Sequence, residues 1–294
     1  MGNVAYNAGR KDEALKHYTR SLELEPASPG VRFLRGIAYH ETGDEEKAVE
    51  DYTKSIELRP ADAGAWGARA TSRRALGKLE EALADAQKAA ELDGAEPTYL
   101  TTQAMIYAKQ GRHEEALKAY DKAIAMDPKR TAFYINRAGV NFQLKRYEAS
   151  LADADKALEL GDKEPTAHLN RGRTLAAMGR LDASAAAYST AIGIKASMLA
   201  HVMRGLVYLE QGKHDAADAD FQKALALKAD APQALAARAM LAWKKGDQAR
   251  AKELFAKAAK TDERLKKDID AVVKALSLSD ALAAVLRAVA QAAN

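Results

Sequence analysis

The stretch that decides the fold is residues 36–60, GIAYHETGDEEKAVEDYTKSIELRP. Apolar residues recur at helical spacing on both sides of Gly43, so the stretch predicts two amphipathic helices joined by a tight turn. A period of about 20–50 residues is typical of stacked repeat architectures. Counterparts of Ala48 recur every 34 residues, except for one 33-residue step before Ala217: Ala14, Ala82, Ala116, Ser150, Ser184, Ala217 and Ala251.

The turn between the two helices carries glycine in almost every repeat. A chain reversal favours positive φ, which glycine adopts without steric cost. In the fifth repeat Lys145 replaces this glycine, so we expect one unusual turn there. The glycines are Gly9, Gly43, Gly77, Gly111, Gly179, Gly212 and Gly246.

Small residues also recur inside both helices and predict close helix crossings. Most repeats place one large aromatic residue between the small ones, which we interpret as packing. The small residues seven positions before the turn are Gly2, Gly36, Ala70, Ala104, Ala138, Gly172, Gly205 and Ala239. The large residues are Tyr18, Tyr52, Tyr120, Tyr188, Phe221 and Phe255.

Over residues 1 to about 262 this arrangement resembles the tetratricopeptide repeat (TPR) family. The resemblance implies an all-α, right-handed α-α superhelix (a TPR solenoid) of about eight helix-turn-helix repeats plus C-terminal capping helices. In such arrays each repeat packs only on its neighbours. The residues that carry the resemblance are Gly36, Tyr39, Gly43, Ala48, Tyr52, Ser55, Pro60 and Trp66.

On this pattern the chain divides into an array, 1–261, and a C-terminal segment, 262–294. Met1 aligns with the middle of a first helix, so the first repeat is truncated and we expect a fragment, a trimmed precursor or a misassigned start. The predicted repeats are about 1–28, 29–62, 63–96, 97–130, 131–164, 165–197, 198–231 and 232–261.

Two further helices are predicted after the array. The stripe of Leu265, Ile269 and Leu276 predicts one capping helix over 262–276. The Ala-rich tail over 279–293 predicts a helix with an apolar face. We interpret it either as a second capping helix packed on the array or as a helix for self-association or docking in a partner's groove, with disorder as a third alternative.

Composition narrows the class of protein. Lys and Arg number 45 and Asp and Glu 41, interspersed along the chain, so there is no nucleic-acid footprint. There is no cysteine, which excludes disulfides and thiolate metal sites. No apolar run reaches the roughly 20 residues of a membrane span. We expect a cytoplasmic protein, or a periplasmic or exported one if an N-terminal segment was removed.

An arginine precedes the small residue in six repeats, at positions 35, 69, 137, 171, 204 and 238. An aspartate stands sixteen residues after four of them, at 51, 85, 153 and 220, so we predict salt bridges between the two helices of a repeat. Arg171 and Arg238 have no such aspartate, and we expect these two to be the better candidates for a functional contact.

The sequence offers no catalytic or metal-binding pattern. His168 and His201 share one repeat position, but no acidic residue or cysteine shares it, so we expect them to replace the large residue Trp66 rather than to bind zinc. No nucleophile with a base, phosphate loop or paired-carboxylate signature is present. We therefore predict a protein that is not an enzyme and has no cofactor.

In the TPR family the first helices line a concave groove, which is the implied binding surface. Chaperone-binding members grip a terminal carboxylate with a Lys/Asn clamp. Here Asn136 and Asn170 match isolated clamp positions, but Met105 and Gly139 do not supply the rest, so an Hsp70 or Hsp90 tail is not the expected partner. Several of the candidates are expected to pack between repeats instead. The groove candidates are Tyr6, Phe33, Ile37, His40, Arg74, Met105, Lys109, Asn136, Phe142, Asn170, Arg173, Val202, Leu206, Met240, Trp243 and Lys244.

These observations predict a non-catalytic scaffold or adaptor that binds a peptide or helix of a protein partner, with a mildly acidic partner favoured. Two alternatives stay open. The chain can be the regulatory TPR portion of a larger multidomain protein or enzyme. It can also be an RNA-binding helical repeat, although that function needs a continuous basic stripe and the charges are interspersed.

Overall fold

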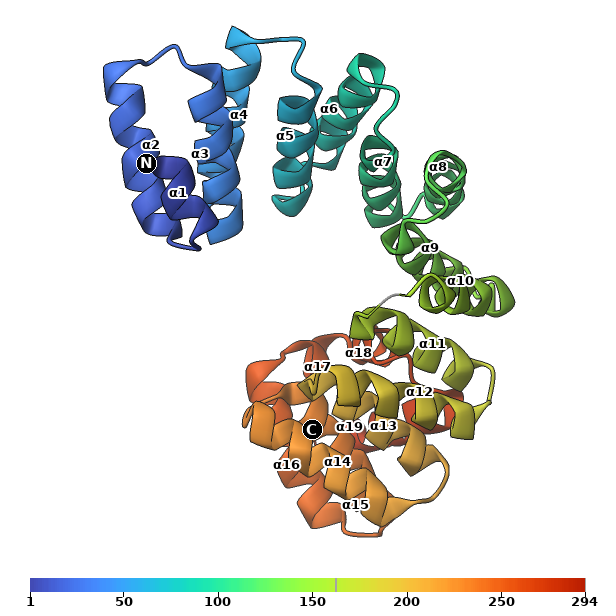
Figure 1. Ribbon diagram of the computed structural model, residues 1–294. Helices are drawn as coiled ribbons and strands as arrows, with labels where there is room; N and C mark the ends of the chain where they lie inside the picture. Colours follow the sequence, from blue (N-terminus) through green and yellow to red (C-terminus); the bar gives the residue numbers. More distant parts are fainter. Residues whose placement is uncertain (162, 294) are drawn as a thin grey trace. The chain divides into compact units, whose positions relative to one another are not determined.

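The computed structural model describes residues 1–161 and 163–293, which are helical and contain no strand. Most helices follow one another as hairpin pairs (Figure 1). The predicted all-α helical-repeat fold is thus confirmed. The pairs are α1 (Gly2–Asn7) with α2 (Lys11–Leu24), α3 (Pro29–Thr42) with α4 (Glu45–Leu58), α5 (Ala63–Ala75) with α6 (Leu79–Leu92), α7 (Thr98–Lys109) with α8 (His113–Met126), α9 (Thr131–Gln143) with α10 (Tyr147–Glu159), α11 (Pro165–Ala177) with α12 (Leu181–Ile194), α13 (Met198–Glu210) with α14 (His214–Leu227), and α15 (Pro232–Lys244) with α16 (Gln248–Thr261).

The chain forms two compact units, Met1–Val140 and the part from Asn141 onward. Within each unit the second helix of a pair packs on the first helix of the next pair, as α4 does on α5 and α12 on α13. Successive first helices also contact one another, as α5 and α7 do in the first unit and α13 and α15 in the second. The division into the eight predicted repeats with their exact limits stays a proposal.

The small residues of the first helices accept the aromatic rings of the second helices. Gly36 packs directly on Tyr52, because a Cβ added to Gly36 would lie 2.7 Å from Tyr52 Cε1. Gly172 and Tyr188 make the same contact, with a distance of 2.9 Å. Both rings are almost fully buried. The predicted packing role of this aromatic position is therefore correct.

The turns have the backbone that their glycines predict. Gly43 has φ 86° and its backbone N–H donates to the His40 carbonyl, which ends α3. Lys145 adopts φ 58° at the equivalent place between α9 and α10. A side chain with a Cβ is strained there by roughly 1–2 kcal/mol, so this turn is formed at a cost in stability.

The C-terminal segment differs from the prediction in one respect. The single helix expected over 262–276 is two short helices, α17 (Arg264–Lys267) and α18 (Ile269–Ala275). Asp268 interrupts the helix, because its carboxylate accepts a hydrogen bond from the Ala271 N–H at 3.0 Å and begins α18 as an N-cap.

The tail helix α19 (Asp280–Ala293) packs on α15 and α16. A following first helix contacts both helices of the preceding pair in the same way, so α19 occupies the place of a ninth first helix. Leu282, Leu286 and Val289 are at most 2 % exposed. The structure thus favours the capping alternative, and the apolar stripe that self-association through 279–293 would use is already covered within the chain.

Candidate functional site

Three arginines of the first helices form the framework between helices, and we call Arg35, Arg69 and Arg204 the framework arginines. Arg69 donates from Nε and Nη2 to the two oxygens of Asp85, each at 2.8 Å, and from Nη1 to Thr53 Oγ1 at 3.1 Å. Asp85 lies on the second helix of the same pair and Thr53 on that of the preceding pair. One guanidinium thus joins three helices.

The other two framework arginines repeat this geometry. Arg35 donates to Asp51 at 2.6 and 2.8 Å, and Arg204 donates to Asp220 at 2.7 Å through two nitrogens. The predicted salt bridges are present at these pairs. For Arg137, the pairing with Asp153 stays a prediction, and the contact that the structure gives is Nη1 to Asp121 at 2.6 Å.

The expectation that Arg171 and Arg238 lack partners was wrong. Arg171 Nε donates to Asp155 at 2.7 Å, and Arg238 Nε donates to Asp218 at 3.0 Å. Both aspartates lie on the second helix of the preceding pair. The spacing of sixteen residues toward the C-terminus does not include them, because they precede the arginines in sequence. In the packed array, a second helix lies on each side of a first helix and can supply the carboxylate. These two arginines therefore join neighbouring helices, as the framework arginines do, and the absence of a partner no longer makes them candidates for a functional contact.

His201 also belongs to the framework. Its Nδ1 lies 2.9 Å from Asp220 Oδ1, and both side chains are buried. Burial alone would raise the pKa of the Asp220 carboxyl, but hydrogen bonds from Arg204 and His201 outweigh it and the net effect lowers that pKa. In the described residues no three His, Cys, Asp or Glu side chains gather as a metal site would require.

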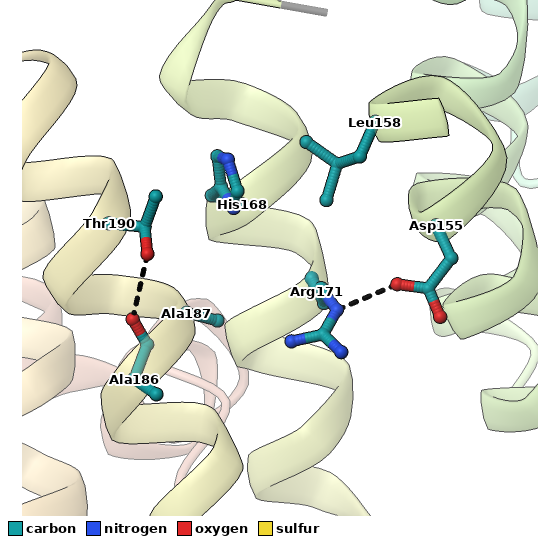
Figure 2. A pocket seen from close by; sticks show the side chains of 7 residues that line it. All are labelled: Asp155, Leu158, His168, Arg171, Ala186, Ala187 and Thr190. Atoms are coloured by element: carbon teal, nitrogen blue, oxygen red, sulfur yellow. Dashed lines mark hydrogen bonds and ion pairs between the residues drawn. The ribbon is translucent and has the colours of Figure 1, made fainter. Parts of the chain in front are cut away.

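His168 lines an open cleft of about 320 Å³ between α10, α11 and α12. Figure 2 shows the Arg171–Asp155 pair on one wall of this cleft and Thr190 on the opposite one. The second helices α10 and α12 supply five of its seven lining residues, and the first helix α11 supplies His168 and Arg171. The remaining lining residues of the cleft are Leu158, Ala186 and Ala187.

In the first unit, side chains join successive first helices along one face, which we call the first-helix face. A hydrogen bond to the Glu41 carboxylate raises the pKa of Tyr6 to about 12, which links α1 to α3. Ser72 Oγ lies 3.4 Å from His40 Nδ1, and Lys109 Nζ donates to the Arg74 carbonyl at 2.8 Å. These contacts bring predicted groove residues of α1, α3, α5 and α7 to one surface.

Most of the predicted groove residues stay accessible, but three do not. Val202, Leu206 and Met240 are 0–5 % exposed, since they lie in the core where α13, α15 and α19 meet, and their assignment to the groove was wrong. Lys109 and Lys244 are exposed. The partly exposed candidates are Tyr6, Phe33, Ile37, His40, Arg74, Met105, Asn136, Phe142, Asn170, Arg173 and Trp243.

Two arginines among these candidates lack the carboxylates that the framework arginines have. Arg74 and Arg173 each have a buried Nε without a hydrogen-bond partner, and neither forms an ion pair within the described residues. The Arg173 guanidinium lies over the Phe142 ring, 4.1 Å from its centroid. Burial lowers the pKa of Arg173. The sequence predicts both residues as groove candidates, but no pattern in it indicates that they lack carboxylate partners.

Helix hairpins in register, a buried arginine–aspartate framework and an open face of first helices define a helical-repeat protein of the αα-hairpin class. A family model described as tetratricopeptide repeat matches residues 1–63, 101–165 and 202–264, and a second model of the same description matches 165–198. Together they match more than half of the chain, so it belongs to the tetratricopeptide repeat family. No match was found among curated proteins.

Solved structures agree with this fold. A tetratricopeptide repeat protein from Parabacteroides merdae is 21% identical over 90% of this chain and 98% of its own, with a TM-score of 0.66. A chain of the Cut9–Hcn1 hetero-tetramer of APC/C is 16% identical over 98% of this chain and 54% of its own, with a TM-score of 0.69. YrrB, described as a TPR protein with an unusual peptide-binding site, is 25% identical over 65% of this chain and 98% of its own, with a TM-score of 0.50.

None of the helices in the described part of the chain has both the length and the apolar character needed to cross a membrane.

Proposed function

We propose that this protein is a non-catalytic scaffold or adaptor and that the first-helix face of its array binds an extended or helical peptide of a partner protein. Family membership supports an interaction role, and YrrB is a TPR protein with a peptide-binding site. Peptide recognition of this kind uses a few apolar anchors in a groove, flanked by polar contacts that set orientation.

The observation that carries the proposal is the contrast between two sets of side chains. The framework arginines are paired with buried aspartates, whereas Arg74 and Arg173 have no counterion. Apolar side chains such as Phe33 and Met105 stay partly exposed on first helices of the first unit, to which Arg74 also belongs. Apolar anchors beside unpaired cations suit a peptide that carries both apolar and acidic residues.

Peptides selected from a random display library on the full chain test this proposal. The variant Phe33→Ala/Met105→Ala should weaken the binding of selected peptides by about tenfold or more, since truncating anchors removes most of the contact energy. Fluorescence anisotropy with the labelled peptide measures the effect. Lys54→Ala/Lys122→Ala, on exposed positions of second helices, is the matched control and should leave the affinity unchanged. Equal affinity of the first variant and the wild type would contradict the proposal.

A further inference from the structure

Ala187 stands where other helix pairs have the aspartate that pairs with the arginine. Each framework arginine donates two hydrogen bonds to an aspartate sixteen residues later, on the second helix of its own pair. In the pair α11–α12 the arginine is Arg171 and the residue sixteen positions later is Ala187. Because a methyl group accepts no hydrogen bond, Arg171 has no carboxylate on its own second helix.

Two nitrogens of Arg171 are left without an acceptor as a result. Nε donates to Asp155 at 2.7 Å, and this is the one hydrogen bond of the side chain within the part of the chain that the structure describes. Nη1 and Nη2, which in Arg69 donate to Thr53 and Asp85, have no acceptor there. The Arg171 side chain is 32 % exposed, against 9 % for Arg69, and neither of its Nη atoms is a buried one without a partner. Both nitrogens are therefore open to solvent.

The space beside these nitrogens is the cleft of about 320 Å³ described above. Figure 2 shows the Arg171 guanidinium between Asp155 of α10 and Ala187 of α12. The volume is at the lower end of the range of ligand sites, roughly 300–1,000 Å³. In the pair α15–α16, Arg238 also lacks an aspartate sixteen residues later, but the residue there is Leu254, which is buried. The pair α11–α12 thus combines the arginine with a small residue and an open space.

The other polar groups of the cleft favour a ligand with a single negative charge. The Thr190 hydroxyl already donates to the Ala186 carbonyl at 3.2 Å, so the hydrogen-bond donors that Arg171 offers remain the ones to satisfy. The Asp155 carboxylate lies on the opposite side of the guanidinium and repels a ligand with two charges more strongly than a ligand with one.

We propose that this cleft binds a carboxylate, carried by a small acid or by an Asp or Glu side chain of a partner protein, and that the carboxylate pairs with Nη1 and Nη2 of Arg171. A guanidinium donates two parallel hydrogen bonds to a carboxylate, as Arg69 does to Asp85. The ligand thus supplies the group that Ala187 lacks. The site contains none of the residues proposed for peptide binding, so it does not rest on the proposed function.

Acetate and inorganic phosphate, compared at constant ionic strength, are the probes for the full chain. The readout is the Arg171 side-chain N–H signals in ¹⁵N NMR spectra, which Arg171→Met identifies by their loss. Acetate should shift these signals saturably, with a Kd in the millimolar range as suits so small a ligand. Phosphate should bind at least about threefold more weakly because of its second charge. A shift that does not saturate with acetate, or tighter binding of phosphate, would overturn the proposal.

Two substitutions that fill the cleft test its location. Ala187→Asp places a carboxylate where Asp85 stands beside Arg69, and Ala187→Leu copies Leu254 without adding charge. Both should weaken acetate binding by about tenfold or more, and the aspartate variant should also raise the melting temperature, because Arg171 gains its missing partner. Ala219→Asp, at an exposed position of α14, is the matched control and should keep the affinity within about twofold. Unchanged acetate affinity in both Ala187 variants would refute the site.

A second compound separates the two sources of the carboxylate. N-acetyl-glutamate N-methylamide presents a glutamate side chain as a polypeptide does. If this compound and acetate both bind, the site takes a side chain of a partner protein, and if acetate alone binds, it takes a small free acid. The absence of binding by both compounds would contradict the inference and would leave the proposed function of the first-helix face unaffected.

Discussion

Arg69 and Asp85 are joined by two hydrogen bonds of 2.8 Å each, which tie the first helix of a pair to its second helix in a buried position. Thr53 from the preceding pair accepts a third hydrogen bond from the same guanidinium. The Arg69–Asp85 ion pair thus links neighbouring helix pairs as well as the two helices of one pair. Since each repeat in such an array is stabilised mainly by its neighbours, the loss of this contact should loosen more than one helix.

Asp85→Ala should destabilise the first unit by about 3 kcal/mol, because it leaves the Arg69 guanidinium buried without its counterion. Urea unfolding followed by circular dichroism measures the loss, and hydrogen exchange should show it in α4, α5 and α6. Glu81→Ala removes an exposed carboxylate that contacts Arg73 and is the matched control, with an expected change below about 0.5 kcal/mol. An equal effect of both variants would show that the burial of the Arg69–Asp85 ion pair does not affect the stability of the first unit.

Acid should destabilise the second unit through Asp220. Hydrogen bonds from Arg204 and His201 more than offset the effect of burial, so the pKa of Asp220 is lower in the folded state than in the unfolded chain. The stabilisation is therefore complete above the unfolded pKa of about 4 and is lost as the pH falls through the lower folded pKa. Melting temperatures measured across this range should fall less steeply for Asp220→Asn than for the wild type. Parallel curves for the two proteins would exclude this residue as a source of acid sensitivity.

Lys145→Gly should stabilise the turn between α9 and α10. Glycine relieves the strain of φ 58°, and the entropy it adds to the unfolded chain offsets part of the gain, so a net increase of about 0.5–1 kcal/mol is expected. The reverse change at an equivalent turn, Gly111→Ala, should destabilise by about 1 kcal/mol, since Gly111 has φ 77°. Thermal unfolding of both variants checks whether the two changes in stability have opposite signs.

Gly36→Ala should destabilise by about 1–3 kcal/mol, because the new methyl group would overlap the buried Tyr52 ring and force it to shift. Gly30→Ala is the control on the same helix, where an added Cβ meets no atom within 4 Å, and it should be neutral or slightly stabilising. Denaturant midpoints compare the two. If Gly36→Ala were as stable as Gly30→Ala, the close contact between the first helix and the ring would not constrain the residue at position 36.

The sequence predicts those features of the fold that depend on local spacing. The glycine turns follow from the need for positive φ, and Lys145 was correctly identified as the unusual turn. The contact of Gly36 with Tyr52 follows from a small residue that recurs in register with a large one. The salt bridges of Arg35, Arg69 and Arg204 were found because their aspartates lie at a constant distance along the chain.

The candidate site was less predictable, because accessibility depends on neighbours that are distant in sequence. Val202 and Phe33 occupy the same position in their repeats, yet Val202 is fully buried and Phe33 is partly exposed. Val202 lies in the core that α19 helps to complete. Apolar periodicity cannot separate the two cases, since an apolar residue satisfies a core and a groove equally well.

By itself, therefore, the sequence determined the helix pairs, their turns and the residues at which helices cross, because each of these depends on the backbone or on a partner at a fixed spacing. Only the tertiary structure decided which charges are paired between one helix pair and the next. It gave Arg171 and Arg238 carboxylates from the preceding pair and left Arg173 without one. The reason is physical, because an ion pair forms only between groups that packing brings within a few ångströms of each other. The sequence of one helix pair does not determine how that pair packs on the next.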